Sequence, residues 1–336
     1  MKVWRISTFG IANLESAEVP DPKPGPRQVL VRVRAVSLNY RDLLMVKGFY
    51  NPKMALPRIP CSDGAGEIAE TGPGVTSVKT GDRVAGIFMQ NWLDGAPTAA
   101  KQKGALGGDI DGMLAEYVVL PEQGVVSFPK HLSYEQAATL PCAGVTAWNA
   151  LMAAHTKAGD TVLIQGTGGV SIFALQFAKL LGARVLGISG SDQKLGRAQK
   201  LGLDAGSNYQ TAPDWADWAL EKTDRQGVDL VVEVGGANTL PQSLKATRIA
   251  GVVVQIGVLT GVEQSLQITP ILHKQLNVKG IYVGSRSDFE TMNKAIEQNA
   301  LVPVVDKVFS FQDAREAFSA MESAGHFGKL VIGYTP

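Results

Sequence analysis

The middle of the chain alternates short apolar segments with amphipathic ones. Four apolar segments have the length and composition of buried strands, at residues 161–165, 184–188, 228–234 and 251–257. Between the first two, residues 170–181 place apolar side chains at i, i+3, i+4, i+7, i+8 and i+11, the stripe of a packed helix. Strands that alternate with helices predict an α/β fold, with a doubly wound parallel sheet of the Rossmann type.

The first third of the chain has a different pattern. Residues 29–36 alternate apolar and polar side chains after the proline-rich loop 21–26, and residues 64–72 and 81–86 resemble strands bounded by glycine turns. These patterns predict an antiparallel, barrel-like β domain. The chain closes in a strand, helix, strand pattern that is expected to fold back onto this domain.

The change of pattern along the chain predicts the domain boundaries. We expect the first part of a catalytic domain at 1–123 and a nucleotide-binding domain at 124–260. Residues 261–336 should hold the end of the parallel sheet and the second part of the catalytic domain. A chain of 336 residues is long enough for about two domains of roughly 150 residues each.

Composition excludes several functional classes. The formal net charge of +1 comes without a basic stripe, which argues against nucleic acid as a partner. No apolar run approaches the roughly 18 residues of a membrane span, and the first residues lack the apolar region of a secretory signal. Two cysteines, Cys61 and Cys142, cannot build a disulfide framework, so a reducing cytoplasm is the expected compartment.

The strongest motif is the run Gly166-Thr167-Gly168-Gly169-Val170-Ser171 between a predicted strand and a predicted helix. Glycines let the backbone approach a pyrophosphate, and the helix N-terminus offers free N–H groups and a partial positive charge. Ser171 stands where the dinucleotide fingerprint has its third glycine. An ordinary tight turn between strand and helix is the alternative interpretation.

The end of the next strand bears on the choice between NAD and NADP. It ends in Ser189-Gly190-Ser191, without the carboxylate that usually holds the ribose of NAD, and Asp192 follows at an expected helix cap. Lys194 and Arg197 lie nearby and would attract a 2′-phosphate. The sequence therefore favours NADPH, although both cations are also compatible with a solvated helix surface.

Several segments together resemble the medium-chain dehydrogenase/reductase superfamily. They are residues 35–42, 64–68, 81–84 and 140–148, together with the glycine loop. The resemblance covers nearly all of the chain. It implies a GroES-like β-barrel catalytic domain, split between the two ends of the chain, around a central Rossmann domain.

The resemblance also bears on metal. Zinc alcohol dehydrogenases of this superfamily bind catalytic zinc through Cys, His and Cys, but this chain has Asn39, Ser62 and Cys142 at those positions. Even with Asp63, the set would be weak for tetrahedral zinc. Residues 89–112 contain no cysteine for a structural zinc lobe. We expect no metal, and we expect Cys142 to be a small buried residue.

The zinc-free branch of the superfamily, with quinone oxidoreductases and 2-enoyl reductases, fits better. Its active-site pattern matches Asn39, Asp42 and Gly48-Phe49-Tyr50, and its 2′-phosphate contacts match Lys194 and Tyr209. The backbone of 325–331 is expected to pass the cofactor, and the nicotinamide to lie near Asn39, Tyr50, Cys142 and Gly257. The full expected cofactor set is Gly166, Thr167, Gly168, Gly169, Val170, Ser189, Gly190, Ser191, Lys194, Arg197, Tyr209, Gly235, Gly257, Val258, Phe327, Gly328 and Lys329.

Without a Lewis acid, conjugate reduction is the easiest hydride chemistry, because charge spreads over the acceptor and a hydrogen-bond donor suffices to hold the developing enolate. Tyr50 and Asn39 are the candidate donors, and Tyr50 could also deliver a proton. As alternatives, Tyr50 lines the rim of the pocket and Asn39 braces the backbone. Tyr40, Asp42 and Cys142 are assigned to the substrate pocket, Asp42 with a helix-bracing role as its other interpretation.

Three functions remain open from the sequence. The leading one is a zinc-independent, NADPH-dependent reductase of quinones or α,β-unsaturated carbonyl compounds. The others are a zinc-free alcohol dehydrogenase or carbonyl reductase, and an NADPH-binding protein with little catalysis.

Residues 276–283 resemble an apolar edge strand of the parallel sheet. In relatives this edge pairs across a two-fold axis, so a homodimer is expected.

Overall fold

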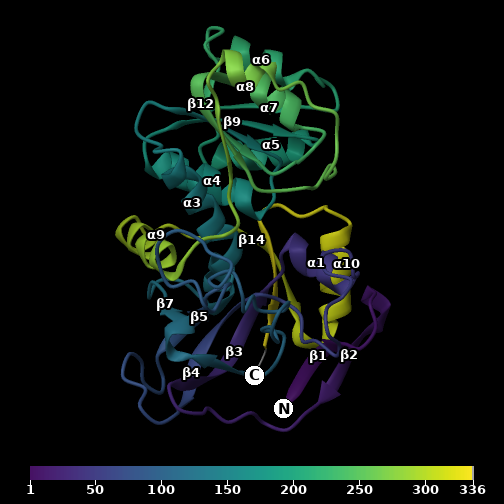
Figure 1. The fold of residues 1–336 in the computed structure, drawn as a ribbon, viewed down its shortest axis with the longest axis vertical. Helices are drawn as coiled ribbons and strands as arrows, with labels where there is room; N and C mark the ends of the chain where they lie inside the picture. The colour runs from purple at the N-terminus through teal and green to yellow at the C-terminus, as the bar shows by residue number, and fades with distance from the viewer. Residues whose placement is uncertain (335–336) are drawn as a thin grey trace. The chain divides into compact units, whose positions relative to one another are not determined.

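The computed structural model describes residues 1–334, which form two compact units (Figure 1). Unit 1 comprises Met1–Val145 and the chain from Gly284 onward, and unit 2 comprises Thr146–Val283. The first boundary falls later than the expected one at 123, because residues 125–127 pair with the sheet of unit 1. Residues 277–280 pair with the sheet of unit 2, so the end of that sheet lies within 261–336, where it was expected.

Unit 2 is built on a parallel sheet of six strands. Their order is β10-β9-β8-β11-β12-β13. The first strand in sequence, β8, lies next to the fourth, β11, and the later strands of each half follow outward on either side. This is the strand order of a doubly wound dinucleotide-binding fold, as predicted. The strands are β8 (Thr161–Gln165), β9 (Arg184–Ser189), β10 (Ala205–Asn208), β11 (Val228–Glu233), β12 (Thr247–Gln255) and β13 (Asn277–Gly280).

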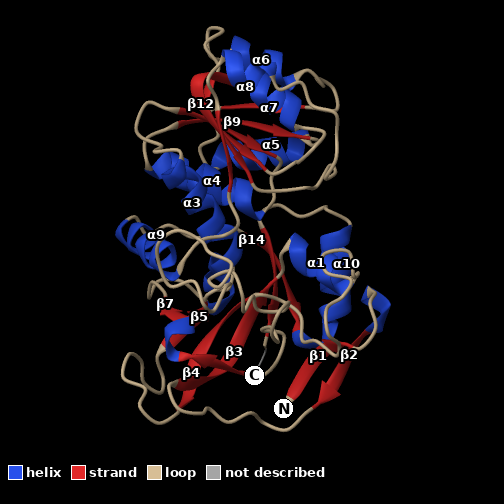
Figure 2. Cartoon of the chain, viewed as in Figure 1, coloured by secondary structure: helices blue, strands red, loops and turns tan. Residues whose placement is uncertain are grey.

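Helices cover the two faces of this sheet (Figure 2). Helices α4 and α5 pack on β8, β9 and β10, whereas α7 packs on β11 and β12 and also against α6. A core of Leu163, Leu186, Trp215 and Leu244 fills one of these interfaces. The helices are α3 (Val145–Ala153), α4 (Gly169–Leu180), α5 (Asp192–Lys200), α6 (Trp215–Glu221), α7 (Leu240–Ala246) and α8 (Thr269–His273).

Unit 1 contains a mostly antiparallel sheet of seven strands and a separate hairpin of β1 and β2. The order is β14-β15-β3-β4-β5-β7, with β6 paired to β3, and only β14 and β15 are parallel. The strands are β1 (Lys2–Ile6), β2 (Leu14–Glu18), β3 (Gln28–Ser37), β4 (Asp63–Thr71), β5 (Arg83–Gly86), β6 (Tyr117–Pro121), β7 (Val125–Ser127), β14 (Val305–Ser310) and β15 (Lys329–Gly333).

The last part of the chain returns to the first, as expected. Strand β15 pairs antiparallel with β3, where Val331 lies opposite Ser37. The helices of unit 1 are α1 (Tyr40–Val46), α2 (Tyr134–Ala137), the π-helical η3 (Leu140–Gly144), α9 (Arg286–Gln298) and α10 (Ala314–Glu322), with short turns η1 (Ile11–Asn13), η2 (Glu122–Gly124) and η4 (Phe311–Asp313). Helices α1 and α10 lie side by side (Figure 1).

The segment 90–110 contains no helix or strand, yet it is anchored in unit 1 through the buried side chains of Trp92 and Leu106. Among residues 1–334, no helix is both long and apolar enough to cross a lipid bilayer.

Candidate active site

The glycine loop follows β8, at the point where the strand order of unit 2 reverses between β8 and β11. Gly166 has a φ of 68°, and a Cβ on Gly166 or Gly168 would meet no atom within 4 Å. Helix α4 begins immediately after, so the amide groups of its first turn have no partner inside the helix. An open, side-chain-free backbone at a helix N-terminus fits a pyrophosphate.

A buried polar network joins this loop to the loop after β11. The Gln165 side chain donates to Glu233 (2.7 Å) and accepts from the N–H of Gly235 (3.1 Å), while the Gln165 carbonyl accepts from the Ser171 hydroxyl (2.6 Å). Glu233 also accepts from the N–H groups of Gly235 and Gly236, at 2.8 and 2.9 Å. Neither Gln165 nor Glu233 was among the expected site residues, although each is a polar residue that ends an apolar strand.

The end of β9 brings several expected cofactor residues together. Ser191 caps α5 by accepting from the N–H of Lys194 (3.3 Å), and its own N–H donates to the Ser189 hydroxyl (3.3 Å). The Tyr209 hydroxyl lies so close to Gly190 that a Cβ there would approach it within 2.8 Å. The helix cap is therefore Ser191; Asp192 is the first helical residue and accepts from Asn208 (3.0 Å).

The remaining expected cofactor residues fall on both units. Gly257 follows β12 and is confined to glycine, because a Cβ would lie 1.9 Å from the Val234 carbonyl oxygen; Val258 next to it is partly exposed. Arg197 is exposed on α5. Phe327, Gly328 and Lys329 belong to unit 1, where the side chains of Phe327 and Lys329 are buried.

In unit 1, Asn39 and Asp42 lie at the start of α1. Asp42 is fully buried, and one carboxylate oxygen accepts from the N–H of Asn39 (2.9 Å). The other accepts from the N–H of Ser62 (3.2 Å) and from the Arg41 guanidinium (3.0 Å). These bonds support the bracing interpretation of Asp42: it fixes the start of α1 against the segment that leads into β4.

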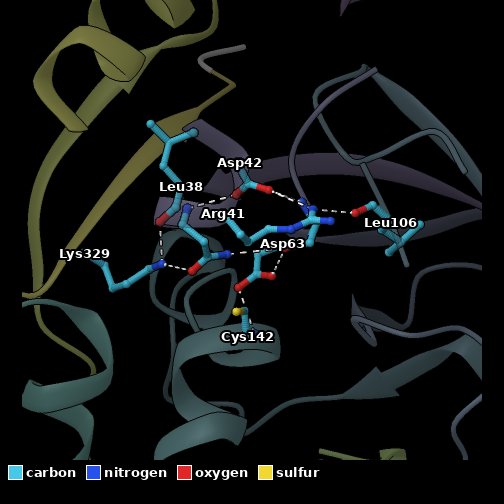
Figure 3. Close-up of polar contacts among 9 residues, drawn as sticks. Leu38, Arg41, Asp42, Asp63, Leu106, Cys142 and Lys329 are labelled. Atoms are coloured by element: carbon cyan, nitrogen blue, oxygen red, sulfur yellow. Dashed lines mark hydrogen bonds and ion pairs between the residues drawn. The ribbon is translucent and has the colours of Figure 1, made fainter. Parts of the chain in front are cut away.

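Asn39 is held from the other side by a lysine. The Lys329 ammonium group, on a side chain only 3 % exposed, donates to the Asn39 side-chain oxygen at 2.5 Å and to the Leu38 carbonyl at 2.5 Å (Figure 3). The Asn39 NH₂ group donates to the Ser62 hydroxyl at 3.4 Å, and that hydroxyl donates to Asp63 at 2.7 Å. The sequence analysis placed the Lys329 segment near the cofactor and did not anticipate this contact.

Asp63 and Cys142 complete the same cluster. The second carboxylate oxygen of Asp63 accepts from the N–H of Cys142 at 2.9 Å (Figure 3). Burial raises the pKa of Asp63 to about 6, although the Lys329 charge opposes the shift. Burial also lowers the pKa of Lys329 and raises that of the Cys142 thiol. Cys142 is only half-buried, which differs from the expected buried residue, and its thiol is neutral at pH 7 because its pKa is raised.

These side chains differ from the usual ligand set of a zinc site. An amide oxygen and a hydroxyl stand at two of the expected ligand positions, and the amide oxygen is already bound to an ammonium group. Zinc is held in proteins by thiolate, imidazole and carboxylate ligands. Within residues 1–334, no group of three or more such side chains is placed to hold a metal ion.

Tyr40 is the first residue of α1, Tyr50 follows the helix, and both side chains are about 40 % exposed. The Arg41 guanidinium lies 5.6 Å from the centroid of the Tyr50 ring and 5.0 Å from that of Phe88. The same guanidinium donates to the Leu106 carbonyl at 2.8 Å. Arg41, which the sequence analysis passed over, therefore connects Tyr50 with Asp42 and with the inner end of segment 90–110.

Two family models match the chain. The alcohol dehydrogenase GroES-like domain matches residues 25–130, and the zinc-binding dehydrogenase domain matches residues 169–298. The chain is 45 % identical to the zinc-type alcohol dehydrogenase-like protein C1773.06c of Schizosaccharomyces pombe, over 97 % of this chain and 96 % of that protein. It is 29 % identical to an acryloyl-coenzyme A reductase of Metallosphaera sedula, over 95 % and 96 % of the two chains.

Solved structures with a similar fold belong to the same kinds of enzyme. An NAD-dependent alcohol dehydrogenase superposes with a TM-score of 0.91 at 34 % identity over the full length of both chains. The 2-octenoyl-CoA carboxylase reductase CinF, in complex with NADP and 2-octenoyl-CoA, superposes with a TM-score of 0.87 at 26 % identity, over 96 % of this chain and 82 % of that one. The chain therefore belongs to the medium-chain dehydrogenase/reductase superfamily, a family of pyridine-nucleotide-binding oxidoreductases with a GroES-like and a Rossmann domain.

Proposed function

We propose that this oxidoreductase transfers hydride from NADPH to quinones or α,β-unsaturated carbonyl compounds, without zinc. The observation that carries the proposal is the Asn39, Ser62, Asp63 and Lys329 cluster. Two of its members, Asn39 and Ser62, stand at metal-ligand positions of the family, and they are a hydrogen-bonded amide and hydroxyl, which are poor zinc ligands. Without a Lewis acid, hydrogen-bond donors must hold the charge that develops on the acceptor, and conjugated acceptors make the smallest demand on them.

The residues of each unit have distinct parts in this proposal. The glycine loop of unit 2 and the groups around Ser191 hold the dinucleotide, which supplies the hydride when bound. In unit 1, the NH₂ group of Asn39 donates a hydrogen bond to the developing enolate or phenolate oxygen. The Tyr50 hydroxyl donates to the same oxygen and delivers a proton to the product. Tyr40 and Cys142 line the acceptor pocket.

The names of the relatives support this chemistry, and they also indicate the second candidate function. An acryloyl group and a 2-octenoyl group are both α,β-unsaturated, and the NADP complex comes from one of those two relatives. Alcohol dehydrogenases are named more often than enoyl reductases among the relatives, and one is NAD-dependent. A zinc-free alcohol dehydrogenase or carbonyl reductase is therefore the second candidate. An NADPH-binding protein with little catalysis is the third.

A substrate panel separates the three candidates. NADPH oxidation would be followed with quinones, enones, enoyl thioesters and simple ketones, and NADP reduction with simple alcohols. The proposal expects turnover of the conjugated acceptors and at most slow reaction of the others. Turnover confined to ketones and alcohols supports the second candidate. Binding of NADPH without turnover of any compound supports the third.

The choice of cofactor can be tested at Lys194. We expect NADPH to bind at least about tenfold tighter than NADH, since a charge-assisted contact to a phosphate contributes about 1.5–3 kcal/mol. Lys194→Ala should weaken NADPH binding and leave NADH binding nearly unchanged, as measured by quenching of tryptophan fluorescence. Equal affinity of the wild type for both cofactors would refute the assignment.

Zinc content and activity after chelation test whether the enzyme works without metal. Protein purified without chelator should contain far less than one zinc per chain by elemental analysis, because an amide and a hydroxyl are poor zinc ligands. Its activity should also survive EDTA. One zinc per chain, lost together with activity on chelation, would contradict the proposed mechanism.

We propose that the protein is a homodimer that pairs through β13. This strand is the edge of the parallel sheet, its four residues are exposed, and the partly exposed side chains of Val278 and Tyr282 lie on or beside it. An uncovered strand edge favours pairing with a second copy. Light scattering at micromolar concentration should give twice the mass of one chain; a monomeric mass would reject this assembly.

A further inference from the structure

We propose that Lys329 is a positioning residue, which holds the Asn39 carboxamide with its NH₂ group, and not its oxygen, available to stabilise negative charge. The proposal rests on the proposed function, in which Asn39 donates to the oxygen of the acceptor. It assigns Lys329 a part in catalysis that is separate from any contact with the cofactor.

The chemistry of the two side chains fixes the orientation of the amide. A lysine ammonium group has three donors and no acceptor, whereas an amide has an acceptor end and a donor end. The end of Asn39 that lies 2.5 Å from the Lys329 nitrogen must therefore be its oxygen. The NH₂ group then faces Ser62. Turning the amide over would place two donor groups against each other in a buried site, where unmatched donors are costly.

The orientation matters because the two ends of an amide act oppositely on an anion. An NH₂ group stabilises a developing enolate, but a carbonyl oxygen repels it. Lys329 thus keeps the NH₂ group of Asn39 available as a donor. Without Lys329, an amide that turned freely would offer its oxygen part of the time. The Lys329 nitrogen lies 2.5 Å from the side-chain oxygen of Asn39, the residue at the family's first zinc-ligand position. Burial lowers the pKa of Lys329, whereas the neighbouring Asp63 and Asp42 charges favour its ammonium form.

The backbone holds Lys329 in place independently of Asn39. Lys329 begins β15, and its N–H donates to the Val304 carbonyl at 3.0 Å. The next residue, Leu330, accepts from the N–H of Leu38 at 3.0 Å, where β15 pairs with the end of β3. The sheet therefore delivers the ammonium group to the residue that precedes α1. A positioning residue needs this kind of rigid support.

Four variants test the proposal: Lys329→Met, Lys329→Arg, Asn39→Ala and the double variant of Lys329→Met with Asn39→Ala. For each, kcat on the best conjugated acceptor, KM, the Kd for NADPH and the midpoint of thermal unfolding would be measured. Lys329→Met should lower kcat by about tenfold or more, with the Kd for NADPH changed less than about twofold. Lys329→Arg should recover part of kcat, because it restores a cationic donor.

The double variant gives the decisive readout. If Lys329 acts through Asn39, removing both side chains should lower kcat no more than Asn39→Ala alone, because the two act as one unit. Independent losses that multiply would overturn the proposal. So would an unchanged kcat in Lys329→Met, or a loss that resides in the Kd for NADPH, which would make Lys329 a cofactor ligand.

Lys274→Met is the control for loss of a half-buried lysine whose ammonium group is bound by backbone carbonyls. The Lys274 ammonium donates to the carbonyls of Leu244, Lys245 and Thr247 at 3.2, 2.6 and 2.8 Å, at the end of α7 in unit 2. Its loss should lower the unfolding midpoint and leave kcat unchanged.

If Lys329→Met does not fold, Asn39→Asp replaces it. This variant keeps an acceptor for Lys329 but has no N–H donor, so it should remain folded and lose kcat by about tenfold or more. A folded Asn39→Asp variant with normal kcat would also overturn the proposal.

Failure of the proposed function gives a different result. In that case the wild type itself turns over no conjugated acceptor. If the wild type is active and the Lys329 variants behave as above, both proposals stand. If the wild type is active and kcat is insensitive to Lys329, only the positioning role falls.

Discussion

Gly168→Glu is expected to raise the Kd for NADPH by about 10²-fold or more without unfolding the protein. The backbone at Gly168 has φ −77° and ψ −178°, which any residue adopts, and a Cβ there meets no atom within 4 Å. The new carboxylate would enter the space in front of α4, where we propose that the pyrophosphate binds. It would replace a charge-assisted hydrogen bond, which is worth about 1.5–3 kcal/mol, by repulsion between like charges.

Gly168→Ala is the matched control, because it adds the Cβ without the charge. It should weaken NADPH binding far less than glutamate does, and both variants should keep a thermal midpoint close to that of the wild type. Fluorescence titration measures the affinity. Unaltered NADPH affinity in a folded Gly168→Glu variant would show that the dinucleotide binds elsewhere.

Tyr50→Phe is expected to lower kcat by about 10²-fold, with the Kd for NADPH unchanged, because the variant loses the proposed proton donor and one donor to the enolate oxygen. The ring itself would stay, since its stacking against Arg41 at 5.6 Å does not need the hydroxyl. Steady-state kinetics on the best conjugated acceptor, together with an NADPH titration, measures both quantities.

Tyr117→Phe controls for the loss of a tyrosine hydroxyl outside the proposed site, because Tyr117 is a half-buried residue at the start of β6. Its kcat should equal that of the wild type. A change in Tyr50→Phe confined to KM would assign Tyr50 to the pocket rim. Wild-type kinetics in Tyr50→Phe would remove Tyr50 from the mechanism and leave Asn39 as the main donor.

The parts of the fold that local patterns control were predictable. The strand predicted at 161–165 coincides with β8, and the helix after the glycine loop differs from α4 by one residue at each end. Both follow from periodicity and glycine chemistry within one βα unit. In contrast, β12 begins at Thr247, four residues before the predicted strand, and Ala250 within it has a φ of 55°, which no apolar pattern announces.

Only part of the candidate site was predictable, because several of its contacts join residues that are far apart in the sequence. The family resemblance singled out Asn39 and Asp42, and the local pattern indicated that Asp42 could brace the helix. The contact of Asn39 with Lys329 joins residues 290 positions apart, and it depends on the pairing of β15 with β3. The Gln165 and Glu233 pair likewise arises where two parallel strands end side by side. Neither contact leaves a periodic signal in the sequence.

The most direct test of the central claim is the position at which the hydride arrives. The enzyme would reduce 2-cyclohexenone with NADPH that carries deuterium at both C4 positions, and the product would be analysed by NMR. We expect cyclohexanone with deuterium on the former β-carbon, because the proposed donors of unit 1 stabilise an enolate. Deuterium on the carbonyl carbon of an allylic alcohol would contradict it and establish direct carbonyl reduction instead.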